Sequence, residues 1–193
     1  MKVQVILGST RPGRVTEKVT KWVANSAAAS GKAEIEIVDL ADYSLSFLEE
    51  PISPQYNPDR KPAPETVKWL DKLAEADAYI FVSPEYNRAL PAVLKNALDH
   101  VAFEMSDKPV TAVTHGSTGG AQAYATLKMI LPALNAIVMP KNVYVQYGNL
   151  ADISDDGELS AELKANPWGP QGPLDAALEQ IFSYAEALKP LRG

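Results

Sequence analysis

Short apolar runs rich in β-branched residues alternate along the chain with longer stretches in which apolar residues recur every three or four positions. The short runs predict β-strands, and the longer stretches predict amphipathic helices. Strands are expected at residues 3–7, 34–40, 78–83, 109–114 and 142–147. Helices are expected at residues 14–30, 65–76, 92–102, 121–134 and 174–189. Gly31 follows the first of these helices and is a plausible stop signal for it.

This alternation of strands and helices is typical of βαβ units, which build a parallel sheet covered on both faces. We expect one domain over residues 1–193, folded as a three-layer α/β/α sandwich with five parallel strands. Two strand orders are common for such sheets, and in both of them ligands bind beyond the carboxyl ends of the strands. In one of the two, the order 2-1-3-4-5, strands one, three and four are neighbours. The loops at 8–16, 84–91 and 115–120 follow these three strands. They would therefore meet at one edge of the sheet.

Two further segments have little periodicity. Residues 41–62 contain four prolines and predict a long loop. Residues 148–172 are rich in Gly, Asp and Pro, with one short helix expected near residues 160–164.

Composition narrows the classes of function. The 193 residues carry 24 acidic and 18 basic side chains, a net charge of −6, which argues against binding to nucleic acid or to an anionic membrane surface. The chain has no cysteine, which excludes disulfides, thiol catalysis and cysteine metal sites, and its two histidines make a histidine-rich metal site improbable. No apolar run approaches the ~20 residues of a membrane span. We expect a cytoplasmic protein that has no resident metal.

The loop at 8–16 combines hydroxyl groups, glycines and two arginines at the start of a helix. Helix starts have unpaired N–H groups and a positive dipole end, and arginine adds charge-assisted hydrogen bonds to phosphate oxygens. The loop therefore indicates a phosphate cradle, although it could be an ordinary βα loop with capping residues. It matches neither Gly-x-x-x-x-Gly-Lys-Ser/Thr nor Gly-x-Gly-x-x-Gly.

The other two loops suggest contacts to a planar ligand. In the loop at 84–91, backbone groups between Pro84 and Pro91 could contact the edge of a ring beside Tyr86; alternatively, the loop is a turn in which Asn87 caps the next helix. The Gly-rich loop at 115–120 lets backbone N–H groups approach a ligand closely. His115 is a candidate general acid or, more simply, a hydrogen-bonded loop histidine.

Two segments resemble the NADPH-dependent FMN reductase family, which includes quinone, azo-dye and chromate reductases. They are Gly8–Arg11 with Thr16, and Ser83–Asn87 with Leu90–Pro91 and Leu94–Asp99. Together with the glycine loop they span residues 3–147 in the family's order. The resemblance implies a flavodoxin-like fold with strand order 2-1-3-4-5, non-covalently bound FMN, and a homodimer or homotetramer.

The resemblance also implies a site and a reaction. Ser9, Arg11 and Thr16 would hold the FMN phosphate, and the full set of cofactor-binding residues would be Ser9, Arg11, Gly13, Arg14, Val15, Thr16, Pro84, Glu85, Tyr86, Asn87, His115, Gly116, Ser117 and Gly119. NADPH or NADH would reduce the flavin, and a quinone or similar small acceptor would reoxidise it in a ping-pong cycle. The cofactor carries this chemistry, so no catalytic side chain is required.

Three positions depart from the family pattern: Thr16 and His115 stand where Ser is usual, and Arg88 where a small residue is commoner. We expect Arg88 at the mouth of the cavity, where it would attract NADPH or an acidic acceptor. Two other functions are compatible with the sequence. One is a flavodoxin-type electron carrier that docks protein partners, and the other is a scaffold without cofactor.

Overall fold

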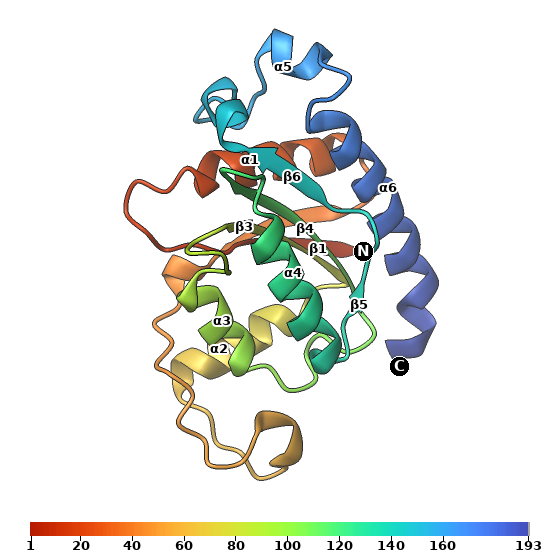
Figure 1. The fold of residues 1–193 in the computed structure, drawn as a ribbon. Coiled ribbons are helices and arrows are strands. Elements are labelled where there is room, and N and C mark those ends of the chain that lie inside the picture. Colours follow the sequence, from red (N-terminus) through yellow and green to blue (C-terminus); the bar gives the residue numbers. More distant parts are fainter. Residues whose placement is uncertain (193) are drawn as a thin grey trace.

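A computed structural model describes residues 1–192, which form a parallel β-sheet with helices on both faces (Figure 1). The strands are β1 (Lys2–Leu7), β2 (Glu34–Asp39), β3 (Ala78–Pro84), β4 (Pro109–Gly116), β5 (Ile137–Val138) and β6 (Val143–Gln146). The α-helices are α1 (Thr16–Ala29), α2 (Pro64–Ala74), α3 (Ala92–Asp99), α4 (Ala121–Ile130), α5 (Ala161–Ala165) and α6 (Gln171–Leu188). The 3-10 helices are η1 (Leu40–Asp42), η2 (Pro54–Tyr56), η3 (Leu131–Leu134), η4 (Tyr147–Asp152) and η5 (Lys189–Arg192).

The strand order is β2-β1-β3-β4-β5, as predicted, and all paired strands run parallel. The predicted fifth strand is only half of the observed edge, because β5 pairs with the start of β4 and β6 pairs with its end. Pro140 lies between these two pieces and has no N–H for the ladder. The sheet therefore contains six strands rather than the predicted five.

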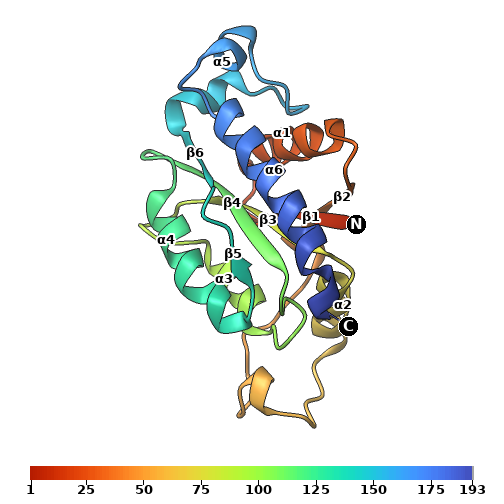
Figure 2. The same cartoon turned by 90° about the vertical axis from the view of Figure 1, so that its right-hand side faces the viewer.

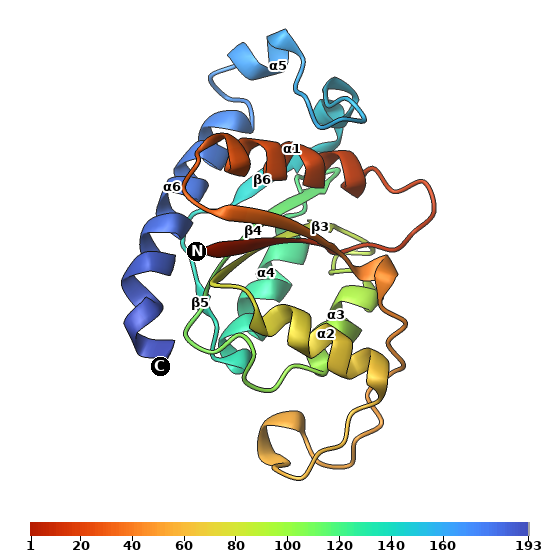
Figure 3. The same cartoon turned by 180° about the vertical axis from the view of Figure 1, so that it is seen from behind.

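Each face of the sheet has its own hydrophobic core. Helices α1 and α6 cover one face, and α2, α3 and α4 cover the other (Figures 2 and 3). The apolar run Ala78–Val82 of β3 is buried on both faces of the sheet: Ala78, Ile80 and Val82 join the core under α1 and α6, whereas Tyr79 and Phe81 join the opposite core. A strand buried on both faces cannot show the alternation of a half-exposed strand.

Proline explains two differences at helix ends. The helix predicted over 121–134 is α-helical only to Ile130 and continues as η3, because Pro132 cannot donate an i→i−4 hydrogen bond. Helix α6 begins at Gln171 rather than at 174, and its Pro173 lies in the first turn, where N–H groups have no helical partner anyway. The helix predicted over 92–102 ends earlier, at Asp99.

The proline-rich segment 41–62 contains η1 and η2 and is tied to the body of the protein. Arg60 pairs with Glu50 at 2.6 Å and donates to the carbonyl of His100 at 3.0 Å. Gln55 donates to the carbonyls of Ala102 and Ala133. These bonds hold the segment against the side of the molecule that carries α3 and η3.

Among residues 1–192, no helix combines the length and apolar character needed to cross a bilayer. The same part of the chain contains no group of three or more His, Cys, Asp or Glu side chains arranged to hold a metal ion.

Candidate functional site

The three loops singled out in the sequence meet at one cavity of about 370 Å³, at the carboxyl edge of the sheet. The loops after β1 and β3 lie on the left of the sheet in Figure 1. The residues that line the cavity are Arg11, Pro12, Gly13, Arg14, Val15, Thr16, Pro84, Glu85, Tyr86, His115, Gly116, Ser117, Tyr147 and Leu150. The predicted convergence of the three loops is confirmed.

The two arginines of the β1–α1 loop have different partners. Arg14 forms an ion pair with Asp39 and donates to the carbonyl of Ser9 at 2.5 Å, so its charge is balanced within the protein. Arg11 is exposed and lies over the Tyr86 ring, with its guanidinium carbon 5.9 Å from the ring centroid. We therefore assign the positive charge available to a ligand to Arg11, and we assign Arg14 to bracing the loop.

The start of α1 presents hydrogen-bond donors to the same cavity. Its N-cap residue is Val15, whose apolar side chain cannot accept a hydrogen bond from the first turn. The backbone N–H groups at the start of this helix are therefore available to an anion, and the helix dipole favours negative charge there. Gly13, two residues before the N-cap, adopts a φ of +69°, a conformation that favours glycine.

The β3–α3 loop is built around a tight turn. Tyr86 and Ala89 exchange two backbone hydrogen bonds, of 2.9 and 3.0 Å, and the two residues between them, Asn87 and Arg88, have φ values of 49° and 67°. Two consecutive positive φ values are typical of a type I′ turn. The alternative in which Asn87 caps the next helix is wrong, because the N-cap of α3 is Pro91.

Glu85 connects this loop to the next one. Its carboxylate accepts a hydrogen bond of 2.9 Å from the backbone N–H of Gln122, in the first turn of α4. An acidic group at a helix N-terminus is stabilised by the helix dipole. The side chain of Glu85 thus helps to hold the β3–α3 and β4–α4 loops in register around the cavity.

His115 lies at the end of β4 and is only 4% exposed. Its Nε2 is 2.9 Å from Oγ1 of Thr16, a side chain that is completely buried. Burial lowers the pKa of His115 to about 4, because the cationic ring would lose its hydration. The ring is therefore neutral at pH 7, which is a poor state for the candidate general acid.

Eleven of the fourteen predicted site residues line the cavity, and Ser9, Asn87 and Gly119 do not. Ser9 lies just behind the lining, with its hydroxyl 3.0 Å from the Tyr86 hydroxyl. Asn87 is exposed in its turn. Gly119 packs against Tyr144 so closely that a Cβ would lie 2.7 Å from the Cβ of that tyrosine. Gly119 thus allows the β4–α4 loop to pack closely against Tyr144 without lining the cavity itself.

Tyr147 and Leu150 were not among the predicted site residues, yet both line the cavity from η4. Tyr147 ends the predicted strand 142–147, and its ring is 72% exposed. The available signal was its position: an aromatic residue at the carboxyl end of a strand belongs to the edge where the three loops meet.

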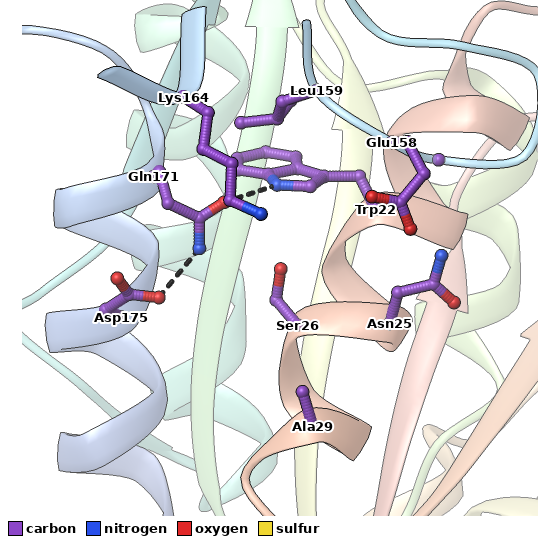
Figure 4. A pocket seen from close by; sticks show the side chains of 10 residues that line it. Trp22, Asn25, Ser26, Ala29, Glu158, Leu159, Lys164, Gln171 and Asp175 are labelled. Carbon is purple, nitrogen blue, oxygen red and sulfur yellow. Dashed lines mark hydrogen bonds between the residues drawn. The ribbon is translucent and has the colours of Figure 1, made fainter. Parts of the chain in front are cut away.

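A second cavity, of about 380 Å³, lies between α1, α6 and the segment before α5 (Figure 4). Trp22 donates to Gln171 at 2.9 Å, Gln171 donates to Asp175 at 2.7 Å, and Asn25 donates to the carbonyl of Asp156 at 3.0 Å. The hydrogen bonds of these three donors are therefore made within the protein. We therefore place the candidate site in the first cavity, which holds the exposed Arg11 and the uncapped start of α1.

Comparison with known proteins decides the family. The model of the NADPH-dependent FMN reductase family matches residues 1–149, which carry all three loops. The chain belongs to the NADPH-dependent FMN reductase family. An NAD(P)H-dependent FMN reductase of Schizosaccharomyces pombe is 35% identical over 153 residues, covering 75% of this chain and 76% of that protein. A quinone reductase of Pseudomonas putida is 32% identical and covers 95% of this chain and 94% of its own.

Solved structures agree with this FMN reductase fold. FerB, a flavoenzyme NAD(P)H:(acceptor) oxidoreductase from Paracoccus denitrificans, superposes with a TM-score of 0.72 at 23% identity and covers 96% of this chain and 97% of its own. At this identity the likeness supports the flavodoxin-like fold alone. The predicted oxidoreductase family, with FMN and NAD(P)H as its cofactors, is thus confirmed at the level of the family. The individual roles of the fourteen predicted site residues stay predictions.

Proposed function

We propose that this FMN reductase family member binds FMN in the cavity at the carboxyl edge of the sheet and uses NAD(P)H to reduce quinones or similar small acceptors. The observation that carries the proposal is the convergence of a cation, an uncapped helix start and two further loops on one cavity of about 370 Å³. The quinone reductase of Pseudomonas putida, similar over 95% of this chain, supports the class of acceptor.

The residues present fit the parts of FMN. Arg11, the Thr16 hydroxyl and the first turn of α1 would hold the phosphate, since together they offer charge, a hydroxyl and backbone N–H groups. Pro84 and Tyr86 would flank the isoalloxazine ring, and the backbone of His115–Ser117 would lie along its other edge. When bound, FMN supplies the redox chemistry by taking a hydride from NAD(P)H and passing two electrons on to the acceptor.

The side chains of the site serve to place and shield the reactants. Tyr86 is held by the Ser9 hydroxyl at 3.0 Å and by the guanidinium of Arg11, so its ring has a defined orientation beside the cavity. Glu85 is engaged with the start of α4. Tyr147 also lines the cavity. Because NAD(P)H and the acceptor would use one site in turn, we propose a ping-pong reaction.

The test of this function uses the purified full chain. We expect it to bind FMN tightly enough to retain the visible absorption of oxidised flavin through gel filtration. We also expect it to oxidise NADPH or NADH with a quinone, with parallel double-reciprocal plots at several quinone concentrations. A chain that holds flavin but gives no turnover with small acceptors would instead indicate an electron carrier. A chain that ignores added FMN would refute both functions.

Arg88 gives a second test of the nucleotide site. It is exposed in the turn after Tyr86, although it is not among the residues that line the cavity. We propose that its charge attracts the phosphates of NADPH at the rim. Arg88→Ala should then raise the KM for NADPH while leaving FMN content unchanged, and an unchanged KM would refute this role.

We also infer that the protein works as a homo-oligomer. Large apolar side chains are exposed on α4 and on the segments before and after α3, notably Phe47, Tyr56, Phe103 and Met129. Light scattering should give the mass of a dimer or tetramer, and the paired substitution Tyr56→Asp with Phe103→Asp should lower it. A monomeric mass for the unaltered chain at micromolar concentration would contradict this inference.

A further inference from the structure

The contact between His115 and Thr16 joins two of the three loops that line the cavity. His115 comes from the end of β4, and Thr16 is the first residue of α1. Their Nε2 and Oγ1 atoms are 2.9 Å apart, although the residues are 99 positions apart in the chain. Both side chains are buried, and both residues line the cavity.

A threonine hydroxyl has one hydrogen and two lone pairs, so its partner decides what it can offer to a ligand. If Nε2 of His115 accepts the hydroxyl hydrogen, the Thr16 oxygen presents only lone pairs to the cavity, and these repel an anion. If Nε2 carries a hydrogen and donates it, the hydroxyl hydrogen of Thr16 is left for an anion. Burial keeps the pKa of His115 at about 4, so at pH 7 the ring carries a single N–H and its tautomer settles the matter.

An anion beside Thr16 would favour donation by His115, because the single hydroxyl hydrogen would then go to the anion and leave a lone pair facing Nε2. Ser9, another hydroxyl residue of this loop, is not among the residues that line the cavity; its hydroxyl oxygen lies 3.0 Å from the Tyr86 hydroxyl and accepts from the N–H of Arg11 at 3.4 Å. The charge of Arg14 is balanced by Asp39. Of the residues from this loop and the start of α1 that line the cavity, Thr16 is the one that carries a hydroxyl, and its hydrogen can serve the ligand provided that its lone pair is occupied by a donor.

We propose that His115 is a positioning residue for the phosphate end of the FMN site: its Nε2–H donates to Thr16 Oγ1 and thereby directs the Thr16 hydrogen to a phosphate oxygen. The inference rests on the proposed function and assigns a task to a residue that does not itself act as an acid. His115 and Thr16 would thus act together: the Thr16 hydroxyl donates the hydrogen bond to the phosphate, and the hydrogen bond from His115 orients that hydroxyl.

The experiment measures the affinity for FMN and for riboflavin, which lacks the phosphate, by quenching of flavin fluorescence. The proteins are the unaltered chain, Thr16→Val, His115→Leu, His115→Gln and the Thr16→Val/His115→Leu double variant. Thr16→Val and His115→Leu should each weaken FMN binding by about 10-fold or more, the effect of losing one hydrogen bond to a charged group. The double variant should be no weaker than Thr16→Val alone, because His115 acts through Thr16. His115→Gln should retain part of the affinity, because its amide can also donate.

Riboflavin binding separates this role from a merely structural one. Affinity for riboflavin should stay the same in all variants that fold. Equal loss of FMN and riboflavin affinity, additive losses in the double variant, or FMN affinity unchanged in His115→Leu would each overturn the inference while leaving the proposed function in place. Failure of the unaltered chain to bind FMN would overturn the proposed function itself, and the inference with it.

A measurement on the unaltered chain keeps the inference falsifiable should the variants fail to fold. Long-range ¹H–¹⁵N correlation NMR distinguishes the two neutral tautomers of a histidine. With FMN bound, we expect the ¹⁵N shifts of His115 to report hydrogen on Nε2. Hydrogen on Nδ1 in that complex would overturn the inference.

Discussion

Burial of His115 should make the flavin-free protein lose stability as the pH falls below neutrality. The imidazole is 4% exposed, and its pKa falls from an ordinary 6.5 to about 4 in the folded chain. Between these two values the unfolded chain binds a proton that the folded chain does not. The free energy of unfolding therefore falls as the pH falls through this window, and it is unaffected by His115 above pH 6.5.

The size of the effect follows from the two pKa values. One pKa unit corresponds to about 1.4 kcal/mol, so the full window of roughly 2.5 units is worth about 3 kcal/mol. Most of this appears early: between pH 8 and pH 5 the linkage relation gives a loss of about 2 kcal/mol. This is a large fraction of the ~5–15 kcal/mol by which a domain of this kind is stable.

Urea unfolding of the flavin-free protein, followed by tryptophan fluorescence at several pH values in phosphate-free buffer, measures the loss. The control is His115→Gln, which removes the titrating group but keeps an amide that can reach Thr16. The unaltered chain should lose about 2 kcal/mol more than His115→Gln between pH 8 and pH 5. His100→Gln removes the other histidine and should retain the loss that His115→Gln abolishes. Equal losses in the unaltered chain and in His115→Gln would refute the argument that burial keeps this ring neutral.

Three further predictions test the loops and the far end of the sheet. Arg11→Ala should weaken FMN binding about 10- to 150-fold, the loss expected for one charge-assisted hydrogen bond. It should not lower the melting temperature, because the side chain is exposed. A variant still fully loaded with flavin would contradict the assignment of Arg11 to the phosphate. Gly120→Ala should destabilise the protein by more than the ~1–2 kcal/mol cost of a left-handed residue. Its φ is +79°, and the new Cβ would lie 2.7 Å from the backbone nitrogen of His115 and 2.7 Å from Thr114 Cβ. An unchanged melting temperature would count against this packing. Burial lowers the pKa of Lys108 to about 8, so between pH 8 and 10.5 only the unfolded chain keeps the proton, and the free energy of unfolding should rise with pH. Lys108→Met should abolish this rise in denaturant titrations. Parallel pH profiles of unfolding free energy for the unaltered chain and for Lys108→Met would refute the prediction.

The position of the site could be predicted because it depends on strand order. Residues 8–16, 84–91 and 115–120 follow strands β1, β3 and β4, which are neighbours in the sheet. Parallel strands end at the same edge, so three loops that are distant in the chain must meet there. The apolar run of β3 carried the same information, since a strand buried on both faces belongs in the middle of such a sheet.

The task of each side chain in the site could not be predicted in this way. Arg11 and Arg14 are three residues apart and look alike in the sequence, yet one lies over Tyr86 and the other pairs with Asp39. The positive φ values of Asn87 and Arg88 were also unforeseen, because Arg at the second position of such a turn is a weak signal. These outcomes depend on which groups the folded chain brings within a few ångströms.

The sequence by itself determined the flavodoxin-like arrangement of strands and helices, the edge at which the loops meet, and the family to which the chain belongs. Periodicity and loop composition are local properties of the sequence. The rules for connecting strands and helices then leave only a few strand orders to consider. Only the tertiary structure decided that Arg14 is neutralised, that Tyr147 completes the cavity wall, and that His115 reaches Thr16 across 99 residues of chain. The physical reason is range: hydrogen bonds and burial act over a few ångströms, and folding alone brings such distant residues that close.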